Sequence, residues 1–206
     1  MTNPTQYRSV LLFGPPGAGK GTQGKILGSI PGFFHLSVGD VFRSIDIGSE
    51  LGQEVCQYTA KGKLVPDELT IKIWKNALDA YVALSWFKPR EDLLVLDGIP
   101  RTVPQTELVE GHIQIVKVIH LQSSNVEDMI LRMQRRAIRE NRADDADEKV
   151  IRKRFEVYRA QTEAVLDCYP KEMIADIEAK GSPAEVLHEI LQALIPIQNQ
   201  HFTRQN

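Results

Sequence analysis

The stretch LLFGPPGAGKGTQ, residues 11–23, runs from an apolar segment into a glycine-rich loop. It nearly matches the phosphate-binding pattern G-x-x-x-x-G-K-[ST], but Gly21 follows Lys20 and Thr22 comes one place late. The glycines let the backbone approach an anion closely because they carry no Cβ atom. The helix expected after the loop points its positive end at the same place. The stretch therefore predicts a phosphate site to which Lys20 adds a full charge.

The residue after Lys20 matters because, in the common version of this loop, its hydroxyl helps to hold magnesium. Gly21 has no hydroxyl. The residues alone leave two explanations open. Either the metal is held in another way, or the loop binds an anion without catalysing a reaction.

Short apolar runs bounded by polar or turn residues mark the expected strands, at 9–13, 33–36, 93–97, 115–121 and 172–177. Segments with helical periodicity are expected at 69–84, 126–133, 149–166 and 184–194. Strands that alternate with helices predict an α/β fold, with a parallel sheet covered on both faces. Ligands bind such sheets beyond the carboxyl ends of the strands. The glycine loop and Asp97, which ends its run, both belong at that edge.

Length and composition predict an ordinary cytoplasmic domain. The 206 residues suffice for one domain, and the net charge of −2 argues against sequence-independent nucleic-acid binding. Cys56, Cys168 and the five histidines show no metal-ligand spacing, which favours a reduced compartment and no thiolate zinc. No run reaches the roughly 18 apolar residues of a membrane span. We expect segments 37–66 and 135–148 to be mobile insertions and the polar tail from Pro196 to be frayed.

Five stretches, in this order, resemble the adenylate kinases and their nucleoside monophosphate kinase relatives: GPPGAGKGTQ, LSVGDVFR, GKLVPDEL, DGIPRTVPQ, and NRADD with IRKR. The resemblance covers most of the chain. It implies a three-layer P-loop fold with a five-stranded parallel sheet, in a single kinase domain spanning 1–206. The core would comprise 1–36, 67–134 and 146–206, with a helical monophosphate-binding insertion at 37–66 and a short lid at 135–145. A lid this short implies no structural zinc.

The resemblance also implies an activity: reversible phosphoryl transfer from ATP to AMP, giving two ADP. Mg²⁺ would accompany ATP, held by phosphates and waters, with Asp97 orienting the waters rather than binding the metal directly. This arrangement would explain how Gly21 can replace the usual hydroxyl. The implied partners are these small nucleotides, bound by a monomer that engages neither nucleic acid nor a membrane.

The implied site residues fall into three groups. Those expected to bind ATP are Gly17, Ala18, Gly19, Lys20, Gly21, Thr22, Arg132, Arg136 and Gly181, the last in the loop AKGSP beside the adenine. Those expected to bind the monophosphate are Val38, Arg43, Lys63, Leu64, Val65, Gly98, Arg101, Gln105, Arg142 and Arg154. Those expected in catalysis are Lys20, Asp97, Arg101, Arg136, Arg142 and Arg154. Phosphoryl transfer leaves the protein little covalent work, so positioned charge must supply the rate.

Arginines crowd one part of the chain, with eight between Arg132 and Arg159. The alternating charges around Arg152 and Arg159 are typical of a solvated surface with ion pairs. Asp144 and Asp145 are expected to hold the lid arginines in place or to latch the closed state. They could also, or instead, cap the helix that follows.

Four residues depart from the family pattern; one of them, Ile99 in place of the commoner phenylalanine, is expected to matter little. Val38 stands where threonine is usual and removes a hydroxyl near the acceptor base, so a UMP/CMP kinase is one alternative, although Asp40 and Gln105 favour the adenylate branch. Ala137 and Asn141 stand where glycine is usual, so the flexibility of the hinge around the lid is expected to differ from that of the family. Two further functions stay open: a nucleotide-binding switch without kinase activity, and a weakened kinase with a scaffolding role. Against a guanine-specific switch, the chain contains no N-K-x-D sequence.

Overall fold

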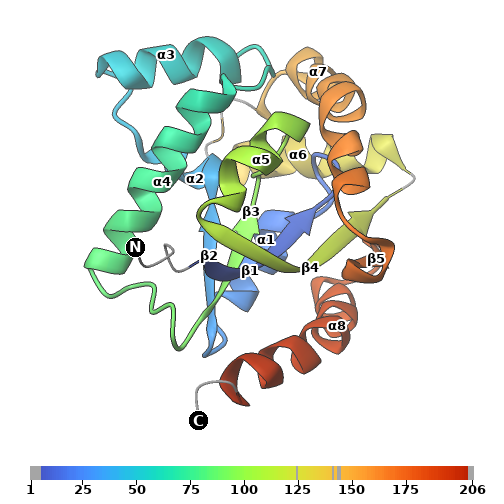
Figure 1. Cartoon of the computed structure of the whole chain (residues 1–206). Coiled ribbons are helices and arrows are strands. Elements are labelled where there is room, and N and C mark those ends of the chain that lie inside the picture. Colours follow the sequence, from blue (N-terminus) through green and yellow to red (C-terminus); the bar gives the residue numbers. More distant parts are fainter. Residues whose placement is uncertain (1–5, 124, 141, 143–144, 204–206) are drawn as a thin grey trace.

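The computed structural model describes residues 6–123, 125–140, 142 and 145–203. Within these residues the chain forms one five-stranded sheet in the order β2-β3-β1-β4-β5, with every pair parallel (Figure 1). The strands are β1 (Tyr7–Phe13), β2 (Phe33–Ser37), β3 (Leu93–Asp97), β4 (Ile113–Gln122) and β5 (Ile174–Glu178). The predicted α/β class is confirmed. Each predicted strand exists, with some ends shifted by one or two residues.

The helices come between the strands and after them. They are α1 (Lys20–Leu27), α2 (Val38–Ser44), α3 (Glu50–Thr59), α4 (Asp67–Ala83), α5 (Val103–Glu110), α6 (Val126–Glu140), α7 (Glu148–Val157) and α8 (Pro183–Thr203). A π-helical turn (Tyr158–Thr162) and 3₁₀ turns (Glu163–Cys168, Lys171–Met173) lead from α7 to β5. The prediction of one regular helix over 149–166 was therefore wrong at its second half. The buried positions Tyr158, Thr162 and Val165 keep a helix-like spacing, so the apolar pattern does not reveal the change in hydrogen bonding.

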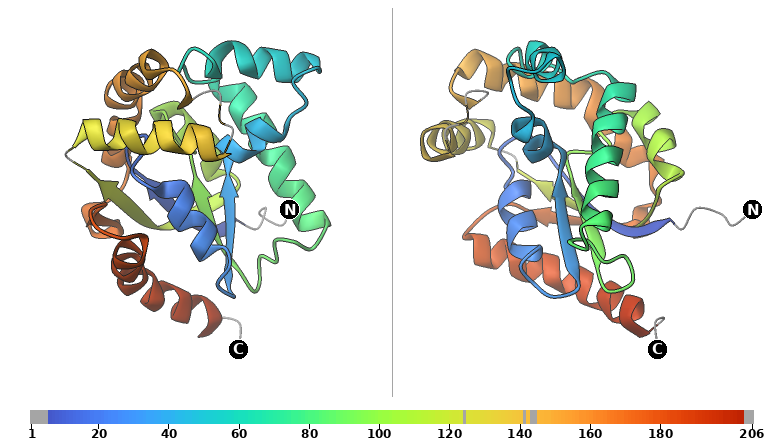
Figure 2. Two further views of the ribbon diagram at one scale, coloured as in Figure 1. Left: turned by 180° about the vertical axis from the view of Figure 1, so that it is seen from behind. Right: turned by 90° about the vertical axis from the view of Figure 1, so that its left-hand side faces the viewer.

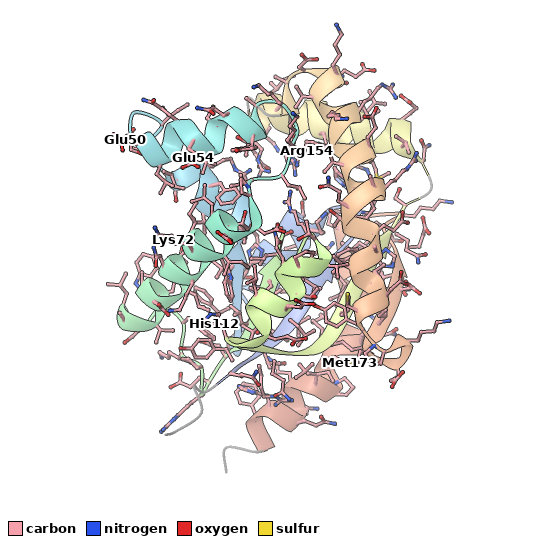
Figure 3. All side chains as sticks on the ribbon, turned by 45° about the horizontal axis from the view of Figure 1, so that its top comes forward. Glu50, Glu54, Lys72, His112, Arg154 and Met173 are labelled. Atoms are coloured by element: carbon pink, nitrogen blue, oxygen red, sulfur yellow. The ribbon has the colours of Figure 1, made fainter. Side chains whose placement is uncertain are left out.

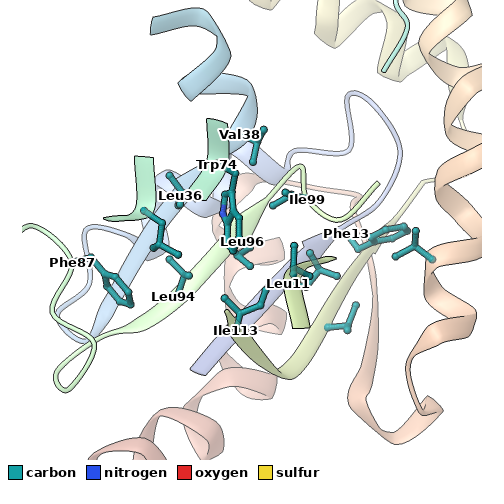
Figure 4. Close-up of a cluster of buried hydrophobic side chains, with 14 of the residues drawn as sticks. Leu11, Phe13, Leu36, Val38, Trp74, Phe87, Leu94, Leu96, Ile99 and Ile113 are labelled. Carbon is teal, nitrogen blue, oxygen red and sulfur yellow. The ribbon is translucent and has the colours of Figure 1, made fainter. Parts of the chain in front are cut away.

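Alternation along β1 builds two cores. Leu11 and Phe13 belong to one buried cluster, which includes Trp74 of α4, and Val10 and Leu12 belong to another. Successive side chains of a strand point to opposite faces, so the sheet is buried on both sides. The second cluster is completed by residues of α1 and α8. Figure 2 shows α1 on one side of the sheet and α4 and α5 on the other, and Figure 4 shows the first cluster in detail.

The register of the central strands brings two predicted site elements together. Leu12 of β1 pairs with Asp97 at the end of β3, so the loop that follows β1 begins beside Asp97. β1 lies between β3 and β4 in the sheet, so the connections from β1 and β3 depart in opposite directions. Ligands bind open parallel sheets at such a switch point.

The expectation of a frayed tail from Pro196 was wrong. Helix α8 continues through Pro196 to Thr203, Ile197 packs against the second core cluster, and His201 is buried. Proline disfavours a helix interior because it removes one backbone hydrogen bond. Here the buried face of α8 continues past Pro196, and its tertiary contacts outweigh that local preference. Within the described residues, no helix is both long enough and apolar enough to cross a membrane.

Candidate active site

A cavity of about 600 Å³ opens at the carboxyl edge of the sheet, between the insertion formed by α2 and α3 and helix α7. It is lined by the residues expected at the monophosphate site: Val38, Arg43, Lys63, Leu64, Val65, Gly98, Arg101, Gln105, Arg142 and Arg154. Lys20 lines it as well. Figure 3 shows Arg154 on the side of α7 that faces α3, and Lys72 on the outer side of α4. Side chains more than a hundred positions apart in sequence thus surround one space.

The phosphate loop has the backbone geometry that its glycines permit. Gly19 takes a left-handed conformation (φ 97°) at the N-cap of α1, and Gly17 has φ 80°. A Cβ at Gly17 would lie 2.9 Å from the carbonyl oxygen of Met129 in α6, so the loop also packs too closely there for a side chain. The N-terminus of α1 therefore points free N–H groups into the turn, as an anion site requires.

Lys20 is folded back over this loop. Its Nζ donates to the carbonyl oxygens of Gly14 (2.7 Å) and Pro15 (2.9 Å). Burial lowers the pKa of Lys20 to about 8; Asp97 opposes the shift, while Arg101, Arg154 and Arg136 add to it. Three arginines whose charges all lower the pKa of one lysine mark a place where an anion would relieve repulsion.

ATP binding should draw a proton onto Lys20 at alkaline pH. Above about pH 8 this amine is largely neutral in the free protein, and phosphate oxygens favour its charged form, so affinity should fall as pH rises through that value. Calorimetric titration at about pH 9, in two buffers of different ionisation enthalpy, should show uptake of up to one proton. Lys20→Met should show no such uptake. Equal binding enthalpies of the wild type in the two buffers would contradict the lowered pKa.

Asp97 lies beside the phosphate loop and has the environment expected for a carboxylate that orders waters around Mg²⁺. A Cβ at Gly21 would come within 3.6 Å of Asp97 Oδ2, so the missing side chain leaves space next to the carboxylate. His35 Nε2 lies 4.0 Å from the same oxygen and is buried. Mg²⁺ usually keeps several waters and few protein ligands, so the residues present fit a hydrated ion.

Asp145 holds two of the predicted catalytic arginines. Its carboxylate is fully buried; one oxygen accepts from Arg136 Nε (2.8 Å) and Nη2, and the other from Arg154 Nη1. This matches the expectation that Asp145 positions the arginines. The alternative of a helix cap is wrong for Asp145, because Asp147 is the residue that caps α7. Asp144 and Asn141 lie outside the described residues.

The segments predicted to be the short lid and the monophosphate-binding insertion contact each other directly. Asp40 of α2 pairs with Arg43 and lies 3.7 Å from Arg142 Nη2, which also contacts Glu140 at 2.8 Å. Burial alone would raise the pKa of Asp40, but the hydrogen bond and charge of Arg43, with the charges of Lys25 and Arg142, hold it below its usual value. The two segments predicted to be mobile insertions thus meet through one carboxylate.

A second network fixes the side of the cavity formed by α4 and α5. Arg101 Nε donates to Gly98 O (2.9 Å), and Arg101 N donates to Gln105 Oε1 (2.7 Å). Gln105 Nε2 donates in turn to Asp67 Oδ1 (2.7 Å), and Asp67 Oδ2 accepts from Thr102 Oγ1 (2.9 Å). Sequence reasoning missed Asp67 and Thr102. The motif PDEL indicates that Asp67 lies near the start of a helix. The residues around it do not reveal that its carboxylate accepts hydrogen bonds from Gln105 and Thr102, which are distant in sequence.

The residues expected around the ATP adenine lie apart from this cavity. Arg132 Nη1 donates to Ala179 O (3.3 Å), which ties α6 to the loop containing Gly181. Gly181 has φ 94°, and a Cβ there would meet the carboxylate of Glu185 at 2.5 Å. Only glycine fits this turn without displacing Glu185. The geometry leaves an exposed backbone edge between α6 and the start of α8.

Two arginines are on the surface as predicted. Arg152 pairs with Glu127 and Glu148, and Arg159 is exposed. Among the described residues, no group of three or more His, Cys, Asp or Glu side chains could hold a metal ion. Both cysteines are free thiols.

Comparison with known proteins gives the family. The adenylate kinase family model matches residues 12–174. The chain is 37% identical over 191 residues to an adenylate kinase of Corynebacterium urealyticum, covering 90% of this chain and 98% of that protein. It is 40% identical over 180 residues to an adenylate kinase of Synechococcus sp. (strain WH7803), covering 84% and 91%, and 39% identical over 191 residues to one of Corynebacterium glutamicum (strain R), covering 90% and 98%. With its parallel sheet, phosphate loop and arginine-lined cavity, the chain belongs to the adenylate kinase family.

Proposed function

We propose that this protein catalyses reversible phosphoryl transfer between ATP and AMP, giving two ADP, with Mg²⁺ accompanying ATP. The observation that carries the proposal is the convergence of Lys20, Arg101, Arg136 and Arg154 on one space, with the phosphate loop on one side and the cavity on the other. Two phosphate chains meeting there would place donor and acceptor oxygens in line. Positioned cations then stabilise the charge that spreads over the transferred group.

Each element of the site has one task in this reaction. The loop of Gly17, Ala18, Gly19, Gly21 and Thr22 cradles the donor phosphates, and Lys20 follows the transferred group. Arg43 and Arg101 hold the acceptor phosphate, and Arg142 and Arg154 reach it from the lid and α7. Arg136 contacts the donor phosphates from the end of α6. Asp97 would hold the waters of a bound Mg²⁺, which would supply charge neutralisation at the donor phosphates. No covalent enzyme intermediate is required.

Closure of the lid excludes water from the acceptor position, which prevents ATP hydrolysis. The Asp40–Arg142 approach and the packing of Gly62 show how the two sides meet. A Cβ at Gly62 would lie 2.8 Å from Val150 O of α7, so the loop before α4 rests directly on α7. Figure 1 shows α3 and α7 facing each other above the sheet.

A monophosphate panel tests the proposal. MgATP with AMP, CMP, UMP or GMP, followed by a coupled assay for ADP, should show the fastest turnover with AMP and none without magnesium. Faster turnover of CMP or UMP would replace the proposal with the pyrimidine alternative. Tight nucleotide binding without ADP formation would support a switch or a scaffolding protein.

Arg101→Ala should lower kcat by about a hundredfold while the fold is retained, because one positioned donor to the transferring group is lost. Circular dichroism and the melting temperature check the fold, and steady-state kinetics check turnover. Arg90→Ala, a change in the exposed loop before β3, provides the matched control and should leave turnover unchanged. Near-normal activity of Arg101→Ala would remove Arg101 from the catalytic set.

We also propose the finer assignments of organisation and location. Residues 37–66 form the monophosphate-binding insertion and 135–145 the lid of a single domain, although 135–140 are already the last turns of α6. The protein is proposed to act as a monomer in the cytoplasm, and its two free thiols favour that reducing compartment.

A further inference from the structure

One side of the cavity carries a hydroxyl that the acceptor site has not yet accounted for. Thr70 lies in the first turns of α4, is 4% exposed, and lines the cavity together with Gln105. Its Oγ1 donates to the carbonyl oxygen of Val65 at 3.2 Å. A hydroxyl has one proton and two lone pairs, so Thr70 can then offer only an acceptor to a ligand.

Val38, which also lines the cavity, offers no such group. Val38 is buried and apolar, and Figure 4 shows it beside Trp74 in the core cluster. The preceding hydroxyl, Ser37 Oγ, accepts from Asp40 N to cap α2. The hydroxyl missing at Val38 is therefore not replaced from α2, and Thr70 supplies one from α4 in the same cavity.

The amide of Gln105 has one allowed orientation. Its Oε1 accepts from the N–H of Arg101, and its Nε2 donates to the carboxylate of Asp67. A flipped amide would place its NH₂ group against the N–H of Arg101 and its oxygen against the carboxylate of Asp67, and neither pair could form a hydrogen bond. Among the residues that the structure describes, no other group takes the second N–H of Nε2 or the second lone pair of Oε1. This pair, donor beside acceptor, matches the edge of adenine formed by its ring nitrogen and its amino group.

Asp67 also brings these two side chains together. Asp67 and Thr70 are three residues apart on α4, so they lie on the same face of the helix. Since Asp67 holds the Gln105 amide, the Thr70 hydroxyl and that amide share one part of the cavity. Their two acceptor sites suit the two hydrogens of an exocyclic amino group and oppose a carbonyl oxygen at the same position.

We propose that Thr70 and Asp67 set the acceptor-base specificity of this kinase: Thr70 accepts an N–H from the 6-amino group of a purine monophosphate, and Asp67 fixes the polarity of Gln105. Asp67 is a positioning residue, because it acts through Gln105. The inference rests on the proposed function, since it concerns the base of the acceptor in that reaction.

Three acceptors test it with saturating MgATP: AMP, inosine monophosphate, which has a 6-oxo group, and purine riboside monophosphate, which has only hydrogen there. Thr70→Val should lower kcat/KM for AMP about tenfold, the value of one neutral hydrogen bond. It should leave purine riboside monophosphate within twofold, and Thr70→Ser should retain the AMP preference. Asp67→Asn should lower the AMP-to-inosine-monophosphate ratio about tenfold, because asparagine can pair with either orientation of Gln105.

Thr106→Val is the matched control. Thr106 is also buried and donates to a backbone carbonyl (Val103 O, 2.6 Å), but it does not line the cavity. The KM for ATP and the circular dichroism spectrum should stay unchanged in all variants. If folded Thr70→Val loses kcat/KM equally for AMP and for purine riboside monophosphate, or loses none for either, the ratio of the two values stays unchanged and the inference is overturned. A wild type that phosphorylates none of the three would instead overturn the proposed function.

Discussion

Replacing Lys20 with methionine should lower kcat about a thousandfold, at the upper end for loss of one preorganised donor. Methionine keeps the length and apolar stem of lysine, so the buried packing should survive. It cannot follow the transferred phosphoryl group, and it removes the charge that closes the phosphate loop. Because Lys20 already lies against the loop carbonyls of Gly14 and Pro15, little reorganisation is needed before it contacts phosphate.

Steady-state kinetics of this variant should be paired with ATP binding by calorimetry. Lys72→Met, on the outer side of α4, is the control for loss of one lysine charge and should retain wild-type turnover. If Lys20→Met binds ATP weakly but turns over normally at saturation, Lys20 acts in binding alone. Full activity at low ATP concentration would contradict both roles.

Asp145→Asn should both destabilise the protein and reduce catalysis. An asparagine of the same size must turn its NH₂ group toward one of the two arginines, which places two donors face to face in a buried site. Removing one partner of a buried ion pair costs about 3–5 kcal/mol. Because Arg136 and Arg154 are partly exposed (23% and 21%), we expect a loss of about 3 kcal/mol. For a chain of this size that corresponds to a melting temperature lower by roughly 6–12 °C.

The same substitution should lower kcat about a hundredfold, because misplacing a catalytic group by about 1 Å costs that much. Asp79→Asn breaks an exposed pair with Lys75 and should shift stability by less than about 1 kcal/mol. Calorimetry and kinetics at low temperature separate the two effects of Asp145→Asn. Unaltered melting together with unaltered turnover would show that Asp145 does not organise the arginines.

The fold was predictable because its signals are local. The apolar runs that became β1 to β5 differ from their surroundings in composition, and the glycine loop after β1 needs only its own sequence to be identified. Ten residues expected around the monophosphate do line one cavity, since the motifs that carry them follow the carboxyl ends of β2 and β3, precede α4 or α7, or lie within α7. The topology of a parallel sheet brings those ends together.

The errors came where tertiary contacts override local preference. Pro196 and the polar residues after it suggested a frayed tail, but α8 continues because Ile197 and His201 find a buried surface. The second half of 149–166 kept a helical spacing of buried residues while its hydrogen bonds changed to π and 3₁₀ patterns. Neither the continuation of α8 nor the change in hydrogen bonding after α7 can be predicted from the local sequence, because both depend on the residues that these segments pack against.

The sequence by itself determined that this protein belongs to an α/β class and predicted a phosphate site at the end of its first strand, because turn chemistry and apolar periodicity act over a few neighbouring residues. Only the tertiary structure decided that Asp145 bridges Arg136 and Arg154, and that Asp67 orients Gln105 from 38 positions away. The direction of a side-chain amide and the partner of a buried carboxylate depend on which distant groups share a desolvated space. Chain order does not encode that directly.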